Sequence, residues 1–114
     1  MPRLLPALSS IPCLVALSLP AAAQLQFDGR YHHSRDRCGD RDTVIVAGDR
    51  TNIYGDCRLT QPTNLRGLHA RAFDLVCPGE GGRTVSERVI LSLGAEGGLL
   101  VVRNAGWSSF GRCP

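Results

Sequence analysis

The residues with the most chemical potential lie around two adjacent histidines, where imidazole, thiol and carboxylate groups are close together: His32, His33, Asp36, Cys38, Asp40 and Asp42. These are the groups that bind zinc, but zinc sites use C-x-x-C or H-x₃₋₅-H spacing, and neither occurs here. The aspartates also lack the order of a calcium-binding loop. We therefore predict a solvated loop of mixed charge with no metal and no cofactor. Metal binding is the alternative.

Catalysis by a serine or cysteine nucleophile would need a histidine and a carboxylate beside it. His69 is the remaining histidine after residue 23, and no G-x-S-x-G motif is present. Glu80 and Glu96 lie among glycines that would hold a carboxylate too loosely for general acid–base work. We predict no catalytic residue. The alternative is a small secreted hydrolase or metal-binding protein that uses His32, His33 or His69.

Three further residues are possible partner contacts: Glu87, Trp107 and Phe110. Glu87 falls on the apolar face of the longest predicted strand, where a carboxylate is costly unless it is paired, for example with Arg103. A strand edge, a register error and a ligand contact inside a barrel are the other interpretations of Glu87. Trp107 and Phe110 fit core or edge positions, and aromatic residues also anchor partners.

An export signal is predicted for the start of the chain. A short positive segment precedes an apolar run, and residues 20–23, Pro-Ala-Ala-Ala, give the small residues that a signal peptidase accepts. The run is too short and too interrupted by Pro6 and Pro12 for a membrane span of about 20 residues. We expect residues 1–23 to be a cleaved signal peptide and residues 24–114 to form one disulfide-stabilised β domain, periplasmic or extracellular.

Removing this leader changes the cysteine count. Of the five cysteines, Cys13 belongs to the leader, which leaves four and suggests two disulfides in an oxidising compartment. Pairing of nearest neighbours is favoured, Cys38 with Cys57 and Cys77 with Cys113, although a strict meander places the second pair at opposite ends.

The charged residues argue against two classes of function. The chain has 114 residues with 13 arginines and no lysine, which excludes a P-loop lysine and a Schiff-base lysine. Acidic residues are interleaved with the arginines, so the uncompensated positive charge that nucleic acids require is missing. We expect no nucleic-acid partner.

Short apolar segments alternate with glycine- and aspartate-rich turns, the pattern of many short strands. Strands are expected near residues 24–31, 43–47, 51–59, 83–93, 99–103 and 107–113, with a connector at residues 60–67. Residues 64–77 fit both helical and strand spacing, and the apolar residues at their end favour a strand. The expected fold is an all-β antiparallel meander of six or seven strands, forming a curled sheet or a small barrel.

The order of glycines and cysteines resembles that of small four-cysteine exported bacterial proteins of unknown function. The resemblance rests on an opening Phe27-Asp28-Gly29, then Gly55-Asp56-Cys57, Cys77-Pro78-Gly79 and a terminal Arg112-Cys113. It implies a scaffold and no activity. In size and class the chain also resembles the periplasmic β-barrel inhibitors of lysozyme and of proteases, whose inhibitory loops are not identifiable here.

We therefore expect an exported, non-enzymatic binding or structural module. Its partner would be a protein or a cell-envelope component, and inhibition of a hydrolase is one form of this function. The sequence assigns neither the partner nor the oligomeric state.

Overall fold

The structure is a computed structural model, and it describes residues 25–114 as eight strands with four one-turn 3₁₀ helices. The predicted signal peptide, residues 1–23, lies outside the described residues. The strands are β1 (Gly29–His32), β2 (Val44–Ala47), β3 (Arg50–Thr51), β4 (Cys57–Asn64), β5 (Ala70–Pro78), β6 (Thr84–Leu93), β7 (Leu99–Arg103) and β8 (Gly106–Arg112). The 3₁₀ helices are η1 (Leu25–Phe27), η2 (Arg35–Arg37), η3 (Glu80–Gly82) and η4 (Ala95–Gly97). Within these residues no helix is long and apolar enough to cross a membrane.

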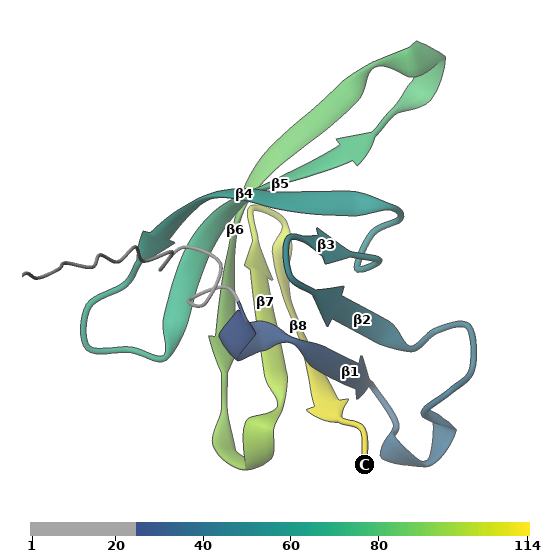
Figure 1. The fold of residues 1–114 in the computed structure, drawn as a ribbon, viewed down its shortest axis with the longest axis vertical. Coiled ribbons are helices and arrows are strands. Elements are labelled where there is room, and N and C mark those ends of the chain that lie inside the picture. Colours follow the sequence, from purple (N-terminus) through teal and green to yellow (C-terminus); the bar gives the residue numbers. More distant parts are fainter. Residues whose placement is uncertain (1–24) are drawn as a thin grey trace, which may run out of the picture.

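Each strand pairs with the next in antiparallel fashion, and β8 pairs with β1, so that the sheet is a closed barrel (Figure 1). The predicted all-β class, the small barrel and the presence of two disulfides are confirmed. The strand count is eight instead of six or seven. Closure removes most of the exposed edges that an open meander of this size would leave.

The longest ladder joins β5 to β6, from Ala70 opposite Ser92 to Pro78 opposite Thr84. Alternation along β6 predicts its inward residues correctly at Val89 and Leu91, which are almost fully buried. Val85 follows the same alternation but is 57% exposed. The reason is that the β5–β6 hairpin extends away from the rest of the barrel (Figure 1), so its inward face has nothing to pack against.

Two segments differ from the expectation at β3 and β4. The strand expected over residues 51–59 is divided, because the chain leaves the sheet after Thr51 and re-enters it at Cys57. The connector expected over residues 60–67 is largely the second half of β4. Pro62 is tolerated there at an irregularity in the register between Thr60 and Thr63, where a proline costs no ladder hydrogen bond. Residues 70–78 are a strand, as favoured.

The favoured disulfide pairing is wrong. The bonds join Cys38 to Cys113 and Cys57 to Cys77. Arg58 lies opposite Val76 in the β4–β5 ladder, so the preceding Cys57 lies opposite Cys77. Barrel closure brings the end of β8 next to β1, and Cys113 thereby reaches the loop that follows β1. Cys77 and Cys113, which a strict meander would place at opposite ends, are not partners, so that difficulty does not arise.

The core fills the barrel with inward side chains from most strands and from η1. Its members are Phe27, Tyr31, Val44, Val46, Cys57, Leu59, Phe73, Leu75, Val89, Leu91, Leu99, Val101 and Phe110. The rings of Phe27 and Phe73 meet edge to face with centroids 6.0 Å apart. This contact holds η1 against β5 inside the barrel.

Candidate binding site at one end of the barrel

Loops alternate between the two ends of the barrel because every strand is antiparallel to the next. The mouth end, as we name it, carries the β1–β2 loop (residues 33–43), the β3–β4 loop (residues 52–56), and the turns after β5 and β7. The opposite end, the plugged end, carries η1 and the turns after β2, β4 and β6. The histidine-rich sequence at residues 32–42 is thus placed at the mouth end.

The plugged end is closed by Phe27, Tyr31 and Arg112. Tyr31 is fully buried and its hydroxyl donates to the carbonyl of Phe27 at 2.7 Å. The guanidinium of Arg112 donates to the Tyr31 hydroxyl at 3.2 Å and to the carbonyl of Asp28 at 3.0 Å. Burial raises the pKa of Tyr31, and the nearby Arg112 offsets part of that rise.

The mouth end holds a half-open cavity of about 430 Å³, a volume typical of ligand sites. One wall comes from the β1–β2 loop, a second from residues 52–54, and the third from β8. The side chains on the β8 wall are Ser108 and Phe110. The lining is mixed, with aromatic rings next to histidine, arginine, aspartate, asparagine and hydroxyl groups.

His32 holds the β1–β2 loop in shape. Its side chain is only 4% exposed, its Nδ1 accepts from the backbone N–H of Ser34 at 2.9 Å, and its Nε2 lies 2.9 Å from Oδ1 of Asp40. Because Nδ1 is an acceptor, the proton of the neutral ring belongs on Nε2, which donates to Asp40. Both ring nitrogens are therefore occupied by the protein itself, and His32 is a positioning residue for the loop.

The carboxylate of Asp40 bonds to several parts of this loop and holds them together. Its Oδ1 also accepts from the backbone N–H of Asp42 at 2.9 Å, and its Oδ2 lies 3.2 Å from Nε of Arg37. Desolvation raises the pKa of Asp40, but the hydrogen bonds from Asp42 and His32 and the charge of Arg37 outweigh it, so that the pKa is lowered. The carboxylate stays ionised and acts as the anchor of the loop.

His33 lies at the surface of the cavity and covers the ring of Phe110. The two ring centroids are 4.5 Å apart at 38°. Phe110 is only 8% exposed, so it belongs to the floor of the cavity and not to the free surface. Of the residues predicted as partner contacts, Phe110 is the one that lines this cavity.

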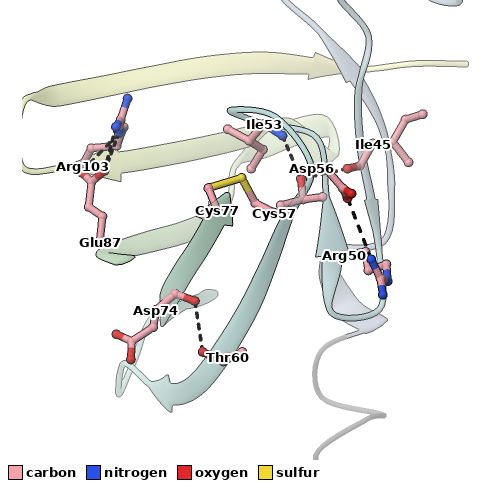
Figure 2. The surroundings of a disulfide bond; sticks show 11 residues. Ile45, Arg50, Ile53, Asp56, Cys57, Thr60, Asp74, Cys77, Glu87 and Arg103 are labelled. Carbon is pink, nitrogen blue, oxygen red and sulfur yellow. Dashed lines mark hydrogen bonds and ion pairs between the residues drawn. A yellow bond between two sulfur atoms is a disulfide. The ribbon is translucent and has the colours of Figure 1, made fainter. Parts of the chain in front are cut away.

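Tyr54 and Arg103 form the side of the mouth nearest to β6 and β7. The Arg103 guanidinium carbon lies 3.9 Å from the ring centroid of Tyr54, and Nη2 of Arg103 lies 2.7 Å from Oε1 of Glu87. Figure 2 shows this ion pair near the Cys57–Cys77 disulfide and Ile53. Glu87 thus has the partner that its position on an apolar face requires. The guanidinium of the same Arg103 packs on the ring of Tyr54.

Hydrogen bonds from Arg103 lower the pKa of Glu87. Desolvation opposes this effect, and the backbone N–H of Asn104, 3.2 Å from Oε2, adds to it. The same pairing raises the pKa of Arg103. Both groups therefore carry full charge near neutral pH, and the β3–β4 loop rests on a fixed support.

Asn52 completes the β3–β4 wall by imitating a strand residue. Its side-chain Oδ1 accepts from the N–H of Ile45 at 2.7 Å, and its Nδ2 donates to the carbonyl of Thr43 at 2.9 Å. These two bonds extend the β2–β3 pairing beyond the short strand β3. All three walls of the cavity are therefore held by specific hydrogen bonds or ladders.

The other candidate residues do not gather at this cavity. Trp107 is 70% exposed and points to the outer face of β8, opposite Val102. His69 lies in the β4–β5 turn at the plugged end, away from His32 and His33. Within residues 25–114 no group of three or more His, Cys, Asp or Glu side chains is placed to hold a metal ion. The three histidines thus do not form one site.

Sequence reasoning did not identify Tyr54, Asn52 or Arg112 as important. Each is a single polar residue in a short segment, with no periodic pattern to mark it. Asn52 and Tyr54 were assigned to the strand expected over residues 51–59, and the asparagine and glycine at positions 52 and 55 were a weak signal for a structured loop there.

Comparison with known proteins found no matching family model, no similar curated protein and no similar solved structure. A function for this chain is therefore argued from the geometry of the mouth end.

Proposed function

We propose that this chain is an exported, non-enzymatic binding module that holds a protein or cell-envelope partner at the mouth end of its barrel. The observation that carries the proposal is the 430 Å³ cavity with preformed walls. A site whose walls are fixed before binding loses little conformational entropy when a partner is held.

Export is supported by the predicted signal peptide and by the two disulfides, which form and persist in oxidising compartments. Binding, in preference to catalysis, is supported by the state of the mouth residues. His32 uses both nitrogens within the loop, and Glu87 is paired with Arg103. These groups fix the shape of the site and leave His33, Tyr54 and Phe110 as its contact surface.

The test is capture of envelope proteins by the oxidised chain 24–114, followed by mass spectrometry of the captured protein. Ser108→Tyr fills the cavity from β8, and His69→Tyr makes the same kind of change at the plugged end. We expect one partner to be captured by the natural chain and by His69→Tyr, and lost with Ser108→Tyr. Equal capture by all three would show that the mouth is not the binding site. Turnover of an envelope substrate that requires His33 or His69 would favour the hydrolase instead.

A further inference from the structure

The seam that closes the barrel is short. β1 and β8 are in register only at Tyr31–Arg112 and His32–Gly111, with one additional bond from the N–H of Cys113 to the carbonyl of Arg30 at 2.8 Å. β8 begins at Gly106, so most of the strand continues past the end of β1 toward the mouth. Its other side is paired with β7 along the whole way from Phe110 to Gly106.

The backbone groups of Trp107 and Ser109 point to the unpaired side. In an antiparallel ladder hydrogen-bonded pairs alternate with non-bonded ones. Because the N–H of Cys113 bonds to Arg30 of β1, the backbone groups that face the β1 side of β8 belong to every second residue, namely 113, 111, 109 and 107. After His32, however, the chain turns away, and the N–H of Ser34 donates to the ring of His32. Among residues 25–114, β1 is in register with β8 only at Tyr31–Arg112 and His32–Gly111, and no turn or loop hydrogen bond reaches the N–H or carbonyl groups of Trp107 and Ser109.

Two other strands, β4 and β6, also have a free side, but both are protected and β8 is not. β6 is unpaired with β7 from Thr84 to Val89, and that stretch carries the charged residues Glu87 and Arg88. Beyond the bond from Leu59 to Asp49, the edge of β4 contains Pro62, a register irregularity, and Gln61 at φ 52°. Proline and bulges are the usual devices that prevent strand addition. The edge of β8 is regular, uncharged and free of proline from Gly106 to Gly111. The contrast within one barrel marks the β8 edge as open for pairing.

Both faces of this edge offer contacts to side chains. On the inner face Ser108 and Phe110 line the mouth cavity, with His33 and Tyr54 among the residues around it. On the outer face Trp107 joins Leu100 and Val102 in an apolar surface depression. A strand laid beside β8 would place alternate side chains into the cavity and against Trp107, since successive residues point to opposite faces.

We infer that the edge of β8 at Trp107 and Ser109 binds an extended peptide segment of the partner by strand addition. The inference rests on the proposed function and names the form of the ligand. The occupant must supply N–H and carbonyl groups at the two-residue repeat of a strand, which is the chemistry of a polypeptide backbone. The loop at residues 33–37 lines the cavity too, and His33 packs on Phe110 beside this edge, so the space suits a single chain segment and not the edge of a second barrel. The segment carries no proline where it faces Trp107 and Ser109.

Amide hydrogen exchange tests the edge first. In the free, oxidised chain we expect the amides of Trp107 and Ser109 to exchange roughly tenfold or more faster than those of Ser108 and Phe110, which bond to β7. An extended probe peptide of alternating threonine and valine should slow the two fast amides, and the same peptide with alternate N-methyl groups should not. Equal protection in the free monomer, or no response to the probe, would overturn the inference. So would protection that appears only as the protein concentration rises, because the occupant would then be a second copy.

Substitutions at Ser109 connect the edge to the partner. Ser109→Pro removes one edge N–H, and Ser109→Ala is the matched control that keeps it. With the partner captured in the experiment above, we expect about tenfold weaker binding for Ser109→Pro and unchanged binding for Ser109→Ala. Should Ser109→Pro bind normally while Ser108→Tyr does not, the cavity function stands and strand addition is wrong. Should neither change matter, the proposed function itself fails. The exchange experiment remains decisive if Ser109→Pro does not fold.

Discussion

Arg112 connects three parts of the plugged end through one guanidinium group. It bonds to the Tyr31 hydroxyl and the Asp28 carbonyl, and its guanidinium carbon lies 5.4 Å from the Tyr31 ring centroid. Asp28 in turn accepts from the N–H of Gly48 in the β2–β3 turn. Residues from both ends of the described chain thus meet in one buried network, and such networks are costly to leave half satisfied.

Tyr31→Phe tests this network. The substitution leaves the Phe27 carbonyl and an Arg112 donor unpaired, and we expect a loss of about 1–3 kcal/mol in the free energy of unfolding.

Because burial raises the pKa of Tyr31, the folded state holds the phenol proton more tightly than the unfolded state. The stability of the natural chain is therefore full below pH about 10 and falls as the pH rises further. Denaturant unfolding from neutral to alkaline pH should show this loss in the natural chain and in Tyr54→Phe, and a weaker one in Tyr31→Phe. An identical pH dependence in all three would contradict the assignment.

Glu87→Gln tests the ion pair at the mouth. The Glu87 side chain is 19% exposed and that of Arg103 is 35%, so solvent screens the pair in part. We expect a loss of roughly 0.5–1.5 kcal/mol near neutral pH. Since the pKa of Glu87 is lowered in the folded state, the stabilisation is present above the unfolded pKa of about 4.3 and disappears as the pH falls through the folded value. Unfolding curves of Glu87→Gln and the natural chain should converge in acid.

Glu80→Gln is the control for Glu87→Gln. Glu80 is exposed in the β5–β6 turn and makes no ion pair with the described residues. We expect a change of less than about 0.5 kcal/mol for this substitution. A comparable loss in both variants would mean that net charge, and not the Arg103 pair, determines the effect.

At the scale of elements, the two disulfides have different effects because they close different loops. The Cys38–Cys113 bond spans 75 residues and the Cys57–Cys77 bond spans 20. In the chain-entropy account, they stabilise by about 4.5 and 3.3 kcal/mol respectively. We therefore expect the alanine pair at 38 and 113 to be about 1 kcal/mol less stable than the alanine pair at 57 and 77. Guanidinium unfolding of both double variants measures this order, and the reverse order would contradict it.

Non-reducing peptide mapping checks the connectivity directly. Protease cleavage between the cysteines should release one disulfide-linked peptide pair containing Cys38 and Cys113 and another containing Cys57 and Cys77. A pair containing Cys38 and Cys57 would contradict the register of β4 with β5, because Cys57 is opposite Cys77 in that ladder.

The elements with strong local patterns could be predicted from the sequence, and those defined by distant partners could not. β2, β6 and β7 follow from β-branched runs or alternation. The barrel closure pairs Tyr31 with Arg112, which are far apart in the sequence, and no local periodicity encodes that contact. The Cys38–Cys113 bond depends on this closure and the Cys57–Cys77 bond on the register of β4 with β5, so the favoured pairing of nearest neighbours was wrong.

The same distinction applies to the candidate site. Glu87 stood out because a charge interrupted an apolar alternation, and its pairing with Arg103 followed from the cost of burial. The function of Tyr54 comes from a loop folding over Arg103, and the free edge at Trp107 comes from the chain leaving β1 early. Both depend on where the chain turns away from the sheet, which the residue types at those points did not determine.

At the scale of the whole molecule, the barrel has one closed end and one open end, and the closed end provides much of the core. Phe27 is fully buried and packs against Phe73, although it precedes the first strand. We expect Phe27→Ala to cost about 3–5 kcal/mol, a large part of the stability of so small a domain. Thermal unfolding should show a clear drop for this variant. Leu68→Ala, at a position 68% exposed, should change stability by less than about 0.5 kcal/mol. Similar effects of the two would mean that η1 does not plug the barrel.

The Cys38–Cys113 bond also determines how the molecule responds to mechanical tension. Force applied between Phe27 and Pro114 would travel from β1 to Cys38, cross the disulfide to Cys113, and leave residues 39–112 outside its path. Extension would then be limited to the segment before Cys38, roughly 40 Å at about 3.4 Å per residue, while most of the strands bear no load. Reduction of that single bond would expose the entire barrel to the pull, so the disulfide acts as a strain limiter that depends on the redox state of its surroundings.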